Sequence, residues 1–208
     1  MLQIIQDEPL FETGLLMAGK VDPHAIQHQL SRWIQTGKIH QLRRGLYSLA
    51  APYQKTVPHP FLTANRLQPN SYISLQSALH WYGMIMEYTP ATTCVTTGRP
   101  AQFSTTLGVF MFQHIQLKYF FGYHPVQLGS GQSAFVALPE KALLDLIYLQ
   151  PQGDDPNYLR ELRLQNLPQL NPTLMSEMVS RMQKPKLMRA VNFLFRLIEE
   201  EKDEYTSL

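Results

Sequence analysis

The sequence predicts an α+β protein in which an N-terminal winged helix-turn-helix precedes a larger mixed α+β domain with a helical C-terminal end. Three observations predict this. A proline-capped helical pattern runs directly into a hairpin pattern, a proline-rich segment follows, and strand-like runs give way to helical ones after Leu138. These boundaries divide the chain into a small unit over residues 1–50, a linker over 51–60 and the larger domain over 61–208.

Two helical segments open the chain. Leu10–Ala18 is predicted as a short helix, followed by a break at residues 19–20. Asp22 is a good N-cap, and Pro23 after it suits the first helical position. The second helix is therefore predicted over Pro23–Thr36, with apolar residues spaced along one face at Ile26, Leu30, Trp33 and Ile34.

A hairpin follows this second helix. Gly37 ends the helix, and His40–Leu49 contains two short strand-like runs within "HQLRRGLYSL". Arg43 and Arg44 lie at the expected turn, where Gly45 supplies the backbone freedom that a tight turn requires. The order helix, break, helix, hairpin is that of a winged helix-turn-helix. By contrast, "LAAPYQKTVPHP" has no helical or strand periodicity and is predicted as the linker.

The larger domain is predicted to begin with a helix capped by Asn70 or Ser71 and continuing through "YISLQSALHWYG". The β-branched run after it predicts a strand, and residues 98–100 its turn. Gly129 and Gly131 mark a loop before the last strand. The predicted strands are Thr92–Thr97, Gly108–Leu117, Lys118–Tyr123 and Ser133–Ala137. Helices are then announced by a proline at the first position, at Pro139, Pro156 and Pro172.

Composition and hydropathy indicate the cellular compartment in which the protein is expected. Hydrophobic residues make up 44% of the 208 residues, which suffices for a packed core. The only cysteine is Cys94, so an internal disulfide framework and a multi-cysteine zinc site are excluded, and a reducing cytoplasm fits. No secretion signal is evident at the N-terminus, and no apolar run approaches the roughly 20 residues that cross a bilayer. We therefore expect a cytoplasmic protein that does not engage a membrane.

The net charge of +2 conceals two basic regions. Residues 20–55 contain six basic side chains and one acidic one, and residues 156–196 contain seven basic and two acidic ones. The acidic tail "EEEKDE" offsets much of this charge. A basic region permits nucleic-acid binding without demonstrating it.

Polar side chains occupy the face of the second helix opposite its apolar residues. Such side chains can meet base edges in a major groove, although an isolated helix with this pattern is more often an ordinary solvated one. Its position before a basic hairpin favours the DNA-binding interpretation. The predicted DNA-binding residues are His24, Gln27, His28, Ser31, Arg32, Gln35, Lys38, Arg43 and Arg44. The two hairpin arginines are expected to hold the sugar-phosphate backbone.

Other motifs are weaker. A second basic patch for DNA or RNA is predicted on the C-terminal helices at Arg181, Lys184, Lys186 and Arg189. His24 and His28 are spaced like helical metal ligands but lack an accompanying acid, so no metal site is predicted. "GSGQS" is interpreted as a β-turn rather than a phosphate loop, and Cys94 as a buried thiol. We expect no cofactor.

The segment "LPEKALLDLIYL" raises an enzymatic alternative. Glu140, Lys141 and Asp145 are the residue types that a metal-dependent nuclease would use. Such motifs normally lie on strands, whereas Pro139 here opens an apolar helix, so a buried scaffold helix with charged residues at its first turn and rim is the preferred interpretation. No complete acid–base, nucleophile or metal set is found, and no catalytic residue is predicted.

Several segments together resemble a known family. In order, "LSRWIQTGKIHQLRRGLYSL", the linker, "YISLQSALHWYGM", "TTCVTTGRP" and "FVALPEKALLDLIYL" resemble the AbiEi-family antitoxins, predicted regulators of viral defence in type IV toxin-antitoxin systems. The resemblance covers about Leu10 to Leu149 and lies in the order and spacing of the segments rather than in one motif. It departs from the family in the second helix, which has few arginines and many Gln and His side chains, so the family's operator preference is not transferable.

The resemblance implies a repressor that binds inverted repeats in its own promoter. It also implies an antitoxin that counteracts a nucleotidyltransferase toxin in phage defence without necessarily contacting it, and inverted repeats would permit self-association on the DNA. Within this resemblance, Pro23–Thr36 is the recognition helix and Arg43 and Arg44 are the wing arginines. Two alternatives stay open: a metal-dependent nuclease, and a winged-helix protein-interaction module that does not bind DNA.

Overall fold

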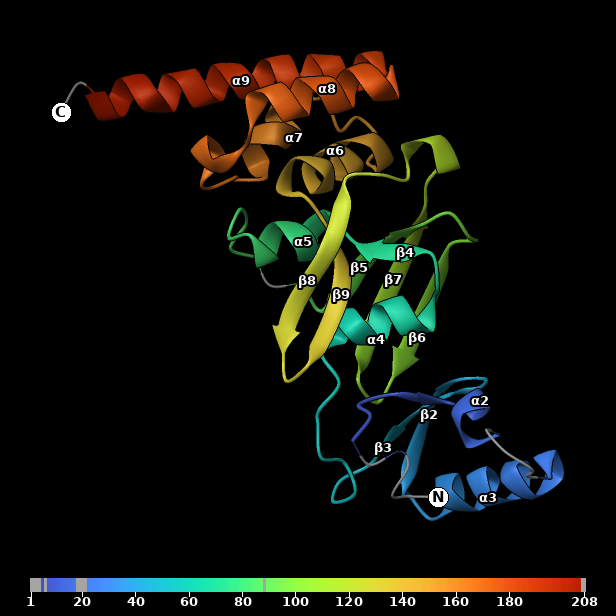
Figure 1. Cartoon of the computed structure of the whole chain (residues 1–208). Coiled ribbons are helices and arrows are strands. Elements are labelled where there is room, and N and C mark those ends of the chain that lie inside the picture. Colours follow the sequence, from blue (N-terminus) through green and yellow to red (C-terminus); the bar gives the residue numbers. More distant parts are fainter. Residues whose placement is uncertain (1–4, 6, 18–21, 88, 207–208) are drawn as a thin grey trace.

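Two β-sheets and eight α-helices make up the part of the chain that the computed structural model describes, namely residue 5 and residues 7–17, 22–87 and 89–206. Figure 1 shows a small sheet with its helices at the N-terminal end, a six-stranded sheet in the middle and a group of helices at the C-terminal end. The predicted mixed α+β class is confirmed. Among the described residues, no helix is long and apolar enough to span a membrane.

The N-terminal unit contains a three-stranded antiparallel sheet in the order β1-β3-β2. Its elements are β1 (Phe11–Glu12), α2 (Thr13–Leu16), α3 (Pro23–Gln35), β2 (Ile39–Arg43) and β3 (Leu46–Leu49). The second helix and the hairpin are confirmed. The helix predicted over Leu10–Ala18 is wrong in part, because Phe11 and Glu12 pair with β3 and only four helical residues follow them. Ala18 and the break predicted at residues 19–20 lie outside the described residues.

Local signals begin and end α3. The Asp22 carboxylate accepts a hydrogen bond from the backbone N–H of His24 at 3.0 Å, and Pro23 occupies the first turn. Gly37 lies just beyond the helix with φ of +66°, a backbone conformation that residues with a Cβ rarely adopt. The apolar face of α3 packs on the small sheet in a core of its own, formed by Ile5, Phe11, Leu16, Ile26, Leu30, Trp33, Ile39, Tyr47 and Leu49.

The larger sheet has the strand order β6-β7-β5-β4-β9-β8. Its parallel pairs are β5 with β7 and β4 with β9, and its other neighbours are antiparallel, so hairpins form both edges. The strands are β4 (Ser71–Ile73), β5 (Ala91–Thr96), β6 (Ala101–Thr105), β7 (Gly108–His114), β8 (Tyr123–Gly129) and β9 (Gln132–Ala137). The strands predicted near β5, β7 and β9 are confirmed.

Two predictions in this domain are wrong. The helix predicted to begin at Asn70 or Ser71 is β4 followed by α5 (Leu75–Trp81), because residues 71–73 pair with β5. The strand predicted over Lys118–Tyr123 is a 3-10 helix at Leu117–Tyr119, and β8 begins only at Tyr123. Two strands were also missed: β6, and β8 beyond its first residue. Pro125 argues against an interior strand, and β8 accommodates it at the edge of the sheet.

The remaining helices cover the large sheet and extend beyond it. They are α4 (Pro60–Leu67), which was not predicted, α6 (Pro139–Leu149), α7 (Pro156–Glu161), α8 (Pro172–Met182) and α9 (Pro185–Thr206). The starts predicted at Pro139, Pro156 and Pro172 are confirmed. Asp155 and Asn171 cap two of these helices by accepting hydrogen bonds from backbone N–H groups at 2.9 and 3.1 Å.

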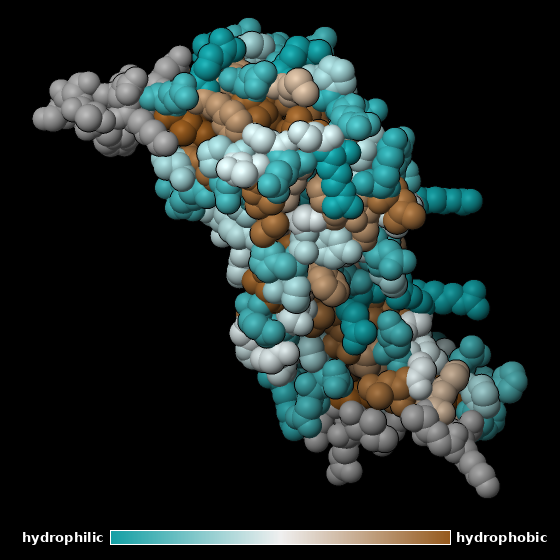
Figure 2. All heavy atoms as spheres, turned by 45° about the horizontal axis from the view of Figure 1, so that its top comes forward, coloured by the Kyte–Doolittle hydropathy of each residue, from teal (hydrophilic) through white to brown (hydrophobic). Residues whose placement is uncertain are grey.

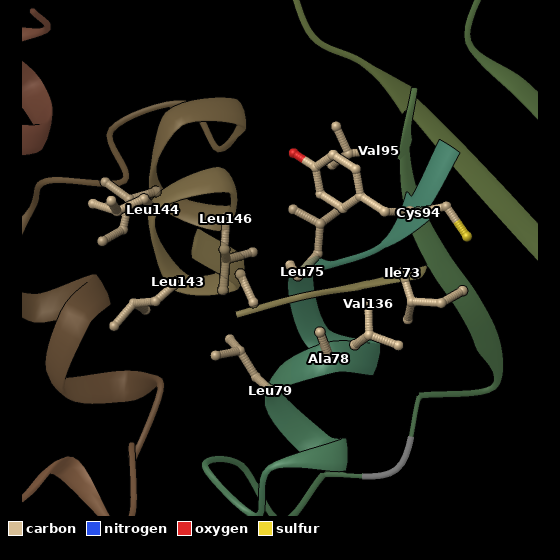
Figure 3. Close-up of a cluster of buried hydrophobic side chains, with 14 of the residues drawn as sticks. Ile73, Leu75, Ala78, Leu79, Cys94, Val95, Val136, Leu143, Leu144 and Leu146 are labelled. Carbon is tan, nitrogen blue, oxygen red and sulfur yellow. The ribbon is translucent and has the colours of Figure 1, made fainter. Parts of the chain in front are cut away.

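The main hydrophobic core lies between the large sheet and the helices. Figure 3 shows side chains of α5 and α6 meeting those of the central strands, among them Ile73, Val136, Ala78 and Leu146. Cys94 lies within this core and is completely buried, as predicted. Burial raises the pKa of its thiol, so the neutral form is strongly favoured.

Candidate nucleic-acid interface

Helix α3 presents a continuous polar surface. The six helical residues predicted to meet DNA are all exposed, whereas Ile26, Leu30 and Trp33 behind them are buried. The exposed set is His24, Gln27, His28, Ser31, Arg32 and Gln35. The predicted division of the helix is therefore correct, except that Ile34 is 38% exposed although its spacing placed it with the apolar residues.

A hollow of about 340 Å³ separates α3 from the tip of the β2–β3 hairpin. Gln27 and Ser31 line it from α3, while Gln41 and Arg44 line it from the hairpin. Thr13 contributes from α2. Side chains from three segments thus form one concave surface, which contains these polar groups and a single arginine beside Leu30, Ile34 and Tyr47. Sequence reasoning missed Thr13 and Gln41, although alternation along β2, with Leu42 buried and Gln41 exposed, was a signal for the second.

The two hairpin arginines have different surroundings in the structure. Arg44 is exposed, and no described residue hydrogen-bonds to its guanidinium. Arg43 instead donates a hydrogen bond from Nη2 to the backbone carbonyl of Arg66 at 3.1 Å and another from Nη1 to the carbonyl of Arg44 at 3.0 Å. Glu12 lies 3.7 Å from the same guanidinium. Sequence reasoning gave both arginines one role, but Arg43 is engaged with the larger domain.

Lys38, the remaining predicted contact, follows α3. It is partly buried, and its ammonium lies 5.9 Å from the centre of the Tyr53 ring. The aromatic face attracts this charge and holds it near the start of the linker segment.

The four C-terminal basic residues predicted as a second patch have different surroundings. Lys186 donates to the backbone carbonyls of Tyr148 and Gln150, and Arg189 forms an ion pair with Asp154 at 2.7 Å. These two side chains therefore hold α9 to the end of α6 and to the loop after it. Figure 2 shows this helical end of the molecule, where hydrophilic side chains cover most of the surface between apolar patches.

The other two members of that patch lie over aromatic rings. The guanidinium of Arg181 is 3.8 Å from the centre of the Phe121 ring, and the ammonium of Lys184 is 5.8 Å from that of Tyr119. Lys118, which was not predicted, lies 4.9 Å from the same Tyr119 ring. Two of the four residues, Lys186 and Arg189, therefore connect helices and loops, whereas Arg181 and Lys184 lie over aromatic rings, and Lys184 shares the Tyr119 ring with Lys118.

Helix α6 is buried, as predicted, and Glu140 lies in its first turn, but its charged residues lie inside the protein and not at a rim. Lys141 and Asp145 are completely buried and form an ion pair one helical turn apart, while Glu140 accepts a hydrogen bond from the backbone N–H of Asn171 at 2.7 Å. Strand β4 and Ser74, the residue that follows it, supply polar partners for these charges, and these partners compensate part of the cost of burying them.

Tyr72 and Ser74 are those partners. Their hydroxyls donate hydrogen bonds to the Asp145 carboxylate at 2.8 and 2.9 Å, and the ammonium of Lys141 donates to the Tyr72 hydroxyl at 2.9 Å. Burial lowers the pKa of Lys141 and raises the pKa of Asp145, whereas their mutual attraction acts in the opposite direction. Sequence reasoning missed both hydroxyls because their segment was interpreted as the start of a helix.

The glycine-rich segment and the paired histidines of α3 were the weaker motifs of the sequence. Within "GSGQS", Ser130 and Gly131 form the turn of the β8–β9 hairpin, both at positive φ, and the flanking residues belong to the two strands. His24 and His28 are exposed on α3. Across the described residues, no group of three or more His, Cys, Asp or Glu side chains is arranged to hold a metal ion.

Neither a comparison with models of known protein families nor one with curated protein sequences finds a match to this chain.

Proposed function

We propose that the protein is a sequence-specific DNA-binding repressor whose N-terminal unit is a winged helix-turn-helix. The observation that carries the proposal is the exposed polar face of α3, which borders a hollow closed on the other side by the hairpin tip and Arg44. Helix α2, helix α3 and the sheet order β1-β3-β2 fit this class of unit.

The dimensions suit a major groove. With 13 residues, α3 is about 20 Å long and narrow enough for a groove roughly 12 Å wide. Gln27, His28 and Ser31 offer both donors and acceptors, which base edges in that groove display in sequence-dependent patterns. Arg44 lies beside this face, and in the proposed complex it meets a phosphate, a contact that contributes affinity and register but no base preference.

The antitoxin part of the proposal rests on the resemblance to the AbiEi family. The protein would repress its own operon and counteract a nucleotidyltransferase toxin in the cytoplasm, with no direct contact between the two proteins required. Co-expression tests this part. Cells that produce a nucleotidyltransferase encoded beside this protein's gene should stop growing, and growth should return when this protein is produced with it. Continued arrest would refute the antitoxin role while leaving DNA binding untouched.

DNA binding is tested with a labelled duplex of the protein's own upstream region, using fluorescence anisotropy over a range of salt concentrations. Arg44→Ala should weaken binding and reduce the slope of log affinity against log salt by about 0.9, the value for one phosphate that is no longer neutralised. Ser31→Ala or Gln35→Ala should instead change which bases are preferred, by roughly 1–3 kcal/mol for each good hydrogen-bonded base interaction that the substitution removes.

Arg196→Ala is the matched control, because Arg196 is an exposed arginine on α9 at the other end of the molecule. It should leave both affinity and salt slope unchanged. Equal binding of wild type and Arg44→Ala would show that the hairpin tip is not part of the DNA interface. No binding to the upstream duplex at low salt would refute the DNA-binding proposal and favour a protein-interaction module.

A further inference from the structure

We infer that Arg43 is a positioning residue that clamps the hairpin tip to the C-terminal end of α4, so that its neighbour Arg44 is held beside α3. The clamp itself is independent of what the surface binds, but its effect on affinity rests on the proposed DNA-binding function.

The guanidinium of Arg43 bridges two backbone carbonyls. One belongs to Arg44 at the hairpin tip and the other to Arg66 in the last turn of α4, 3.0 and 3.1 Å away. The last carbonyls of a helix have no partner within the helix and carry partial negative charge, so a cation is favoured there. Arg43 therefore satisfies a carbonyl of α4 and one of the hairpin with a single rigid group.

The hairpin is buried on both faces, which a freely extending wing would not be. Ile39, Tyr47 and Leu49 belong to the core shared with α3. Leu42 and Leu46 belong instead to the main core, together with Ala64 and Leu67 of α4. Leu46 is completely buried, and all four residues of β3 lie in the interior. The hairpin thus packs against both units, and Arg43 adds hydrogen bonds between its tip and α4.

A second set of hydrogen bonds attaches the segment before α4 to the large sheet. The side-chain amide of Gln132 on β9 accepts a hydrogen bond from the backbone N–H of His59 at 2.7 Å and donates one to the carbonyl of Val57 at 2.9 Å. The predicted linker is therefore hydrogen-bonded to the large sheet immediately before α4 begins. Arg43 consequently fastens the tip to an anchored helix.

The surroundings of the two side chains distinguish Arg43 from Arg44. Arg43 has its donors directed to carbonyls, and its Nε is buried without a hydrogen-bond partner among the described residues. Arg44 faces the hollow beside α3. A phosphate could therefore reach Arg44 without any rearrangement, whereas Arg43 would have to leave both carbonyls first.

Three variants test the clamp in the full chain: Arg43→Ala, Arg43→Lys and the matched neighbour Arg44→Ala. Hydrogen exchange should become faster at the backbone amides of residues 42–46 in both Arg43 variants and stay as in the wild type in Arg44→Ala. Lysine should not rescue, because a single ammonium does not reproduce the planar fork that spans two carbonyls. This measurement involves no DNA, so it stands if the proposed function fails.

The DNA titration separates positioning from direct phosphate binding. If the aligned tip falls to between roughly a third and a tenth of the population, affinity should fall about three- to tenfold in Arg43→Ala, with an unchanged salt slope. Arg44→Ala should lower the slope. The inference is overturned if Arg43→Ala lowers the slope as Arg44→Ala does and lysine restores the affinity, since Arg43 would then bind a phosphate itself. Unchanged hydrogen exchange in Arg43→Ala would also overturn it.

Discussion

The largest effect of a single substitution on the free energy of unfolding is expected at the buried ion pair Lys141–Asp145. Replacing Lys141 with Met removes one charge and leaves the Asp145 carboxylate inside the protein with only the hydroxyls of Tyr72 and Ser74 as partners. Breaking a buried pair in this way costs about 3–5 kcal/mol of unfolding free energy. Because whole domains are stable by only about 5–15 kcal/mol, this single change should remove a large part of the stability.

The double variant is more informative than either single one. Lys141→Met with Asp145→Asn removes both charges, while the Asn carbonyl oxygen can still accept hydrogen bonds from Tyr72 and Ser74. Its cost should be roughly 1–3 kcal/mol, because no charge is left unpaired and the loss is limited to the hydrogen bonds of the ammonium and to an Asn NH2 group that faces the new methionine without a partner. Asp145→Asn alone should cost more than the double variant, since it leaves the Lys141 ammonium without its counter-charge. The effects of the two changes should therefore be strongly non-additive.

Urea denaturation followed by circular dichroism at neutral pH measures these free energies, with an unchanged m-value as the check that unfolding remains comparable. Lys55→Met is the matched control, because Lys55 pairs with Asp7 at 2.9 Å on the surface, where both side chains are more than half exposed. That change should cost about 0–1 kcal/mol. Lys141 and Asp145 do not form a stabilising buried pair if Lys141→Met costs no more unfolding free energy than Lys55→Met, or if the cost of the double variant equals the sum of the costs of the single ones.

Three further outcomes are expected. Cys94 should not react with a thiol reagent in the native protein and should react fully in urea, because burial raises the pKa of its thiol and blocks access; labelling without denaturant would contradict this. Asp22→Ala should cost about 1 kcal/mol in thermal or urea unfolding, because α3 then has no N-cap side chain. Partial burial acts to raise the pKa of Asp154, but the hydrogen bond from Arg189 holds it below the ordinary value. This carboxylate therefore contributes stability that is lost as pH falls through its folded pKa, and the pH dependence of unfolding should weaken there in Arg189→Ala.

Sequence patterns succeeded where the deciding interactions are local. Asp22, Asp155 and Asn171 cap helices through their own backbone neighbours, and a proline follows each of them, so the starts of α3, α7 and α8 could be predicted. The same holds for the exposed face of α3, because a helical period determines which side chains share a face.

The same patterns failed where a distant partner decides. Residues 71–73 suit a helix start by sequence, but pairing with β5 and β9 makes them a strand. β8 tolerates Pro125 only because its outer edge has no neighbouring strand in the described sheet. Backbone propensity is a weak preference that such pairing overrides.

The sequence by itself determined the α+β class, the caps that begin the helices, the polar face of α3 and the interior thiol of Cys94, because each could be inferred from the pattern of residues within one helix or strand. Only the tertiary structure decided that Lys141 and Asp145 lie buried against Tyr72, and that Arg43 and Arg44 have different surroundings. Tyr72 is 69 residues from Lys141, and the carbonyl that holds Arg43 is 23 residues away. Arg43 and Arg44 could not be distinguished in the sequence, whereas in the structure α4 supplies a carbonyl to Arg43 and leaves Arg44 at the hollow beside α3.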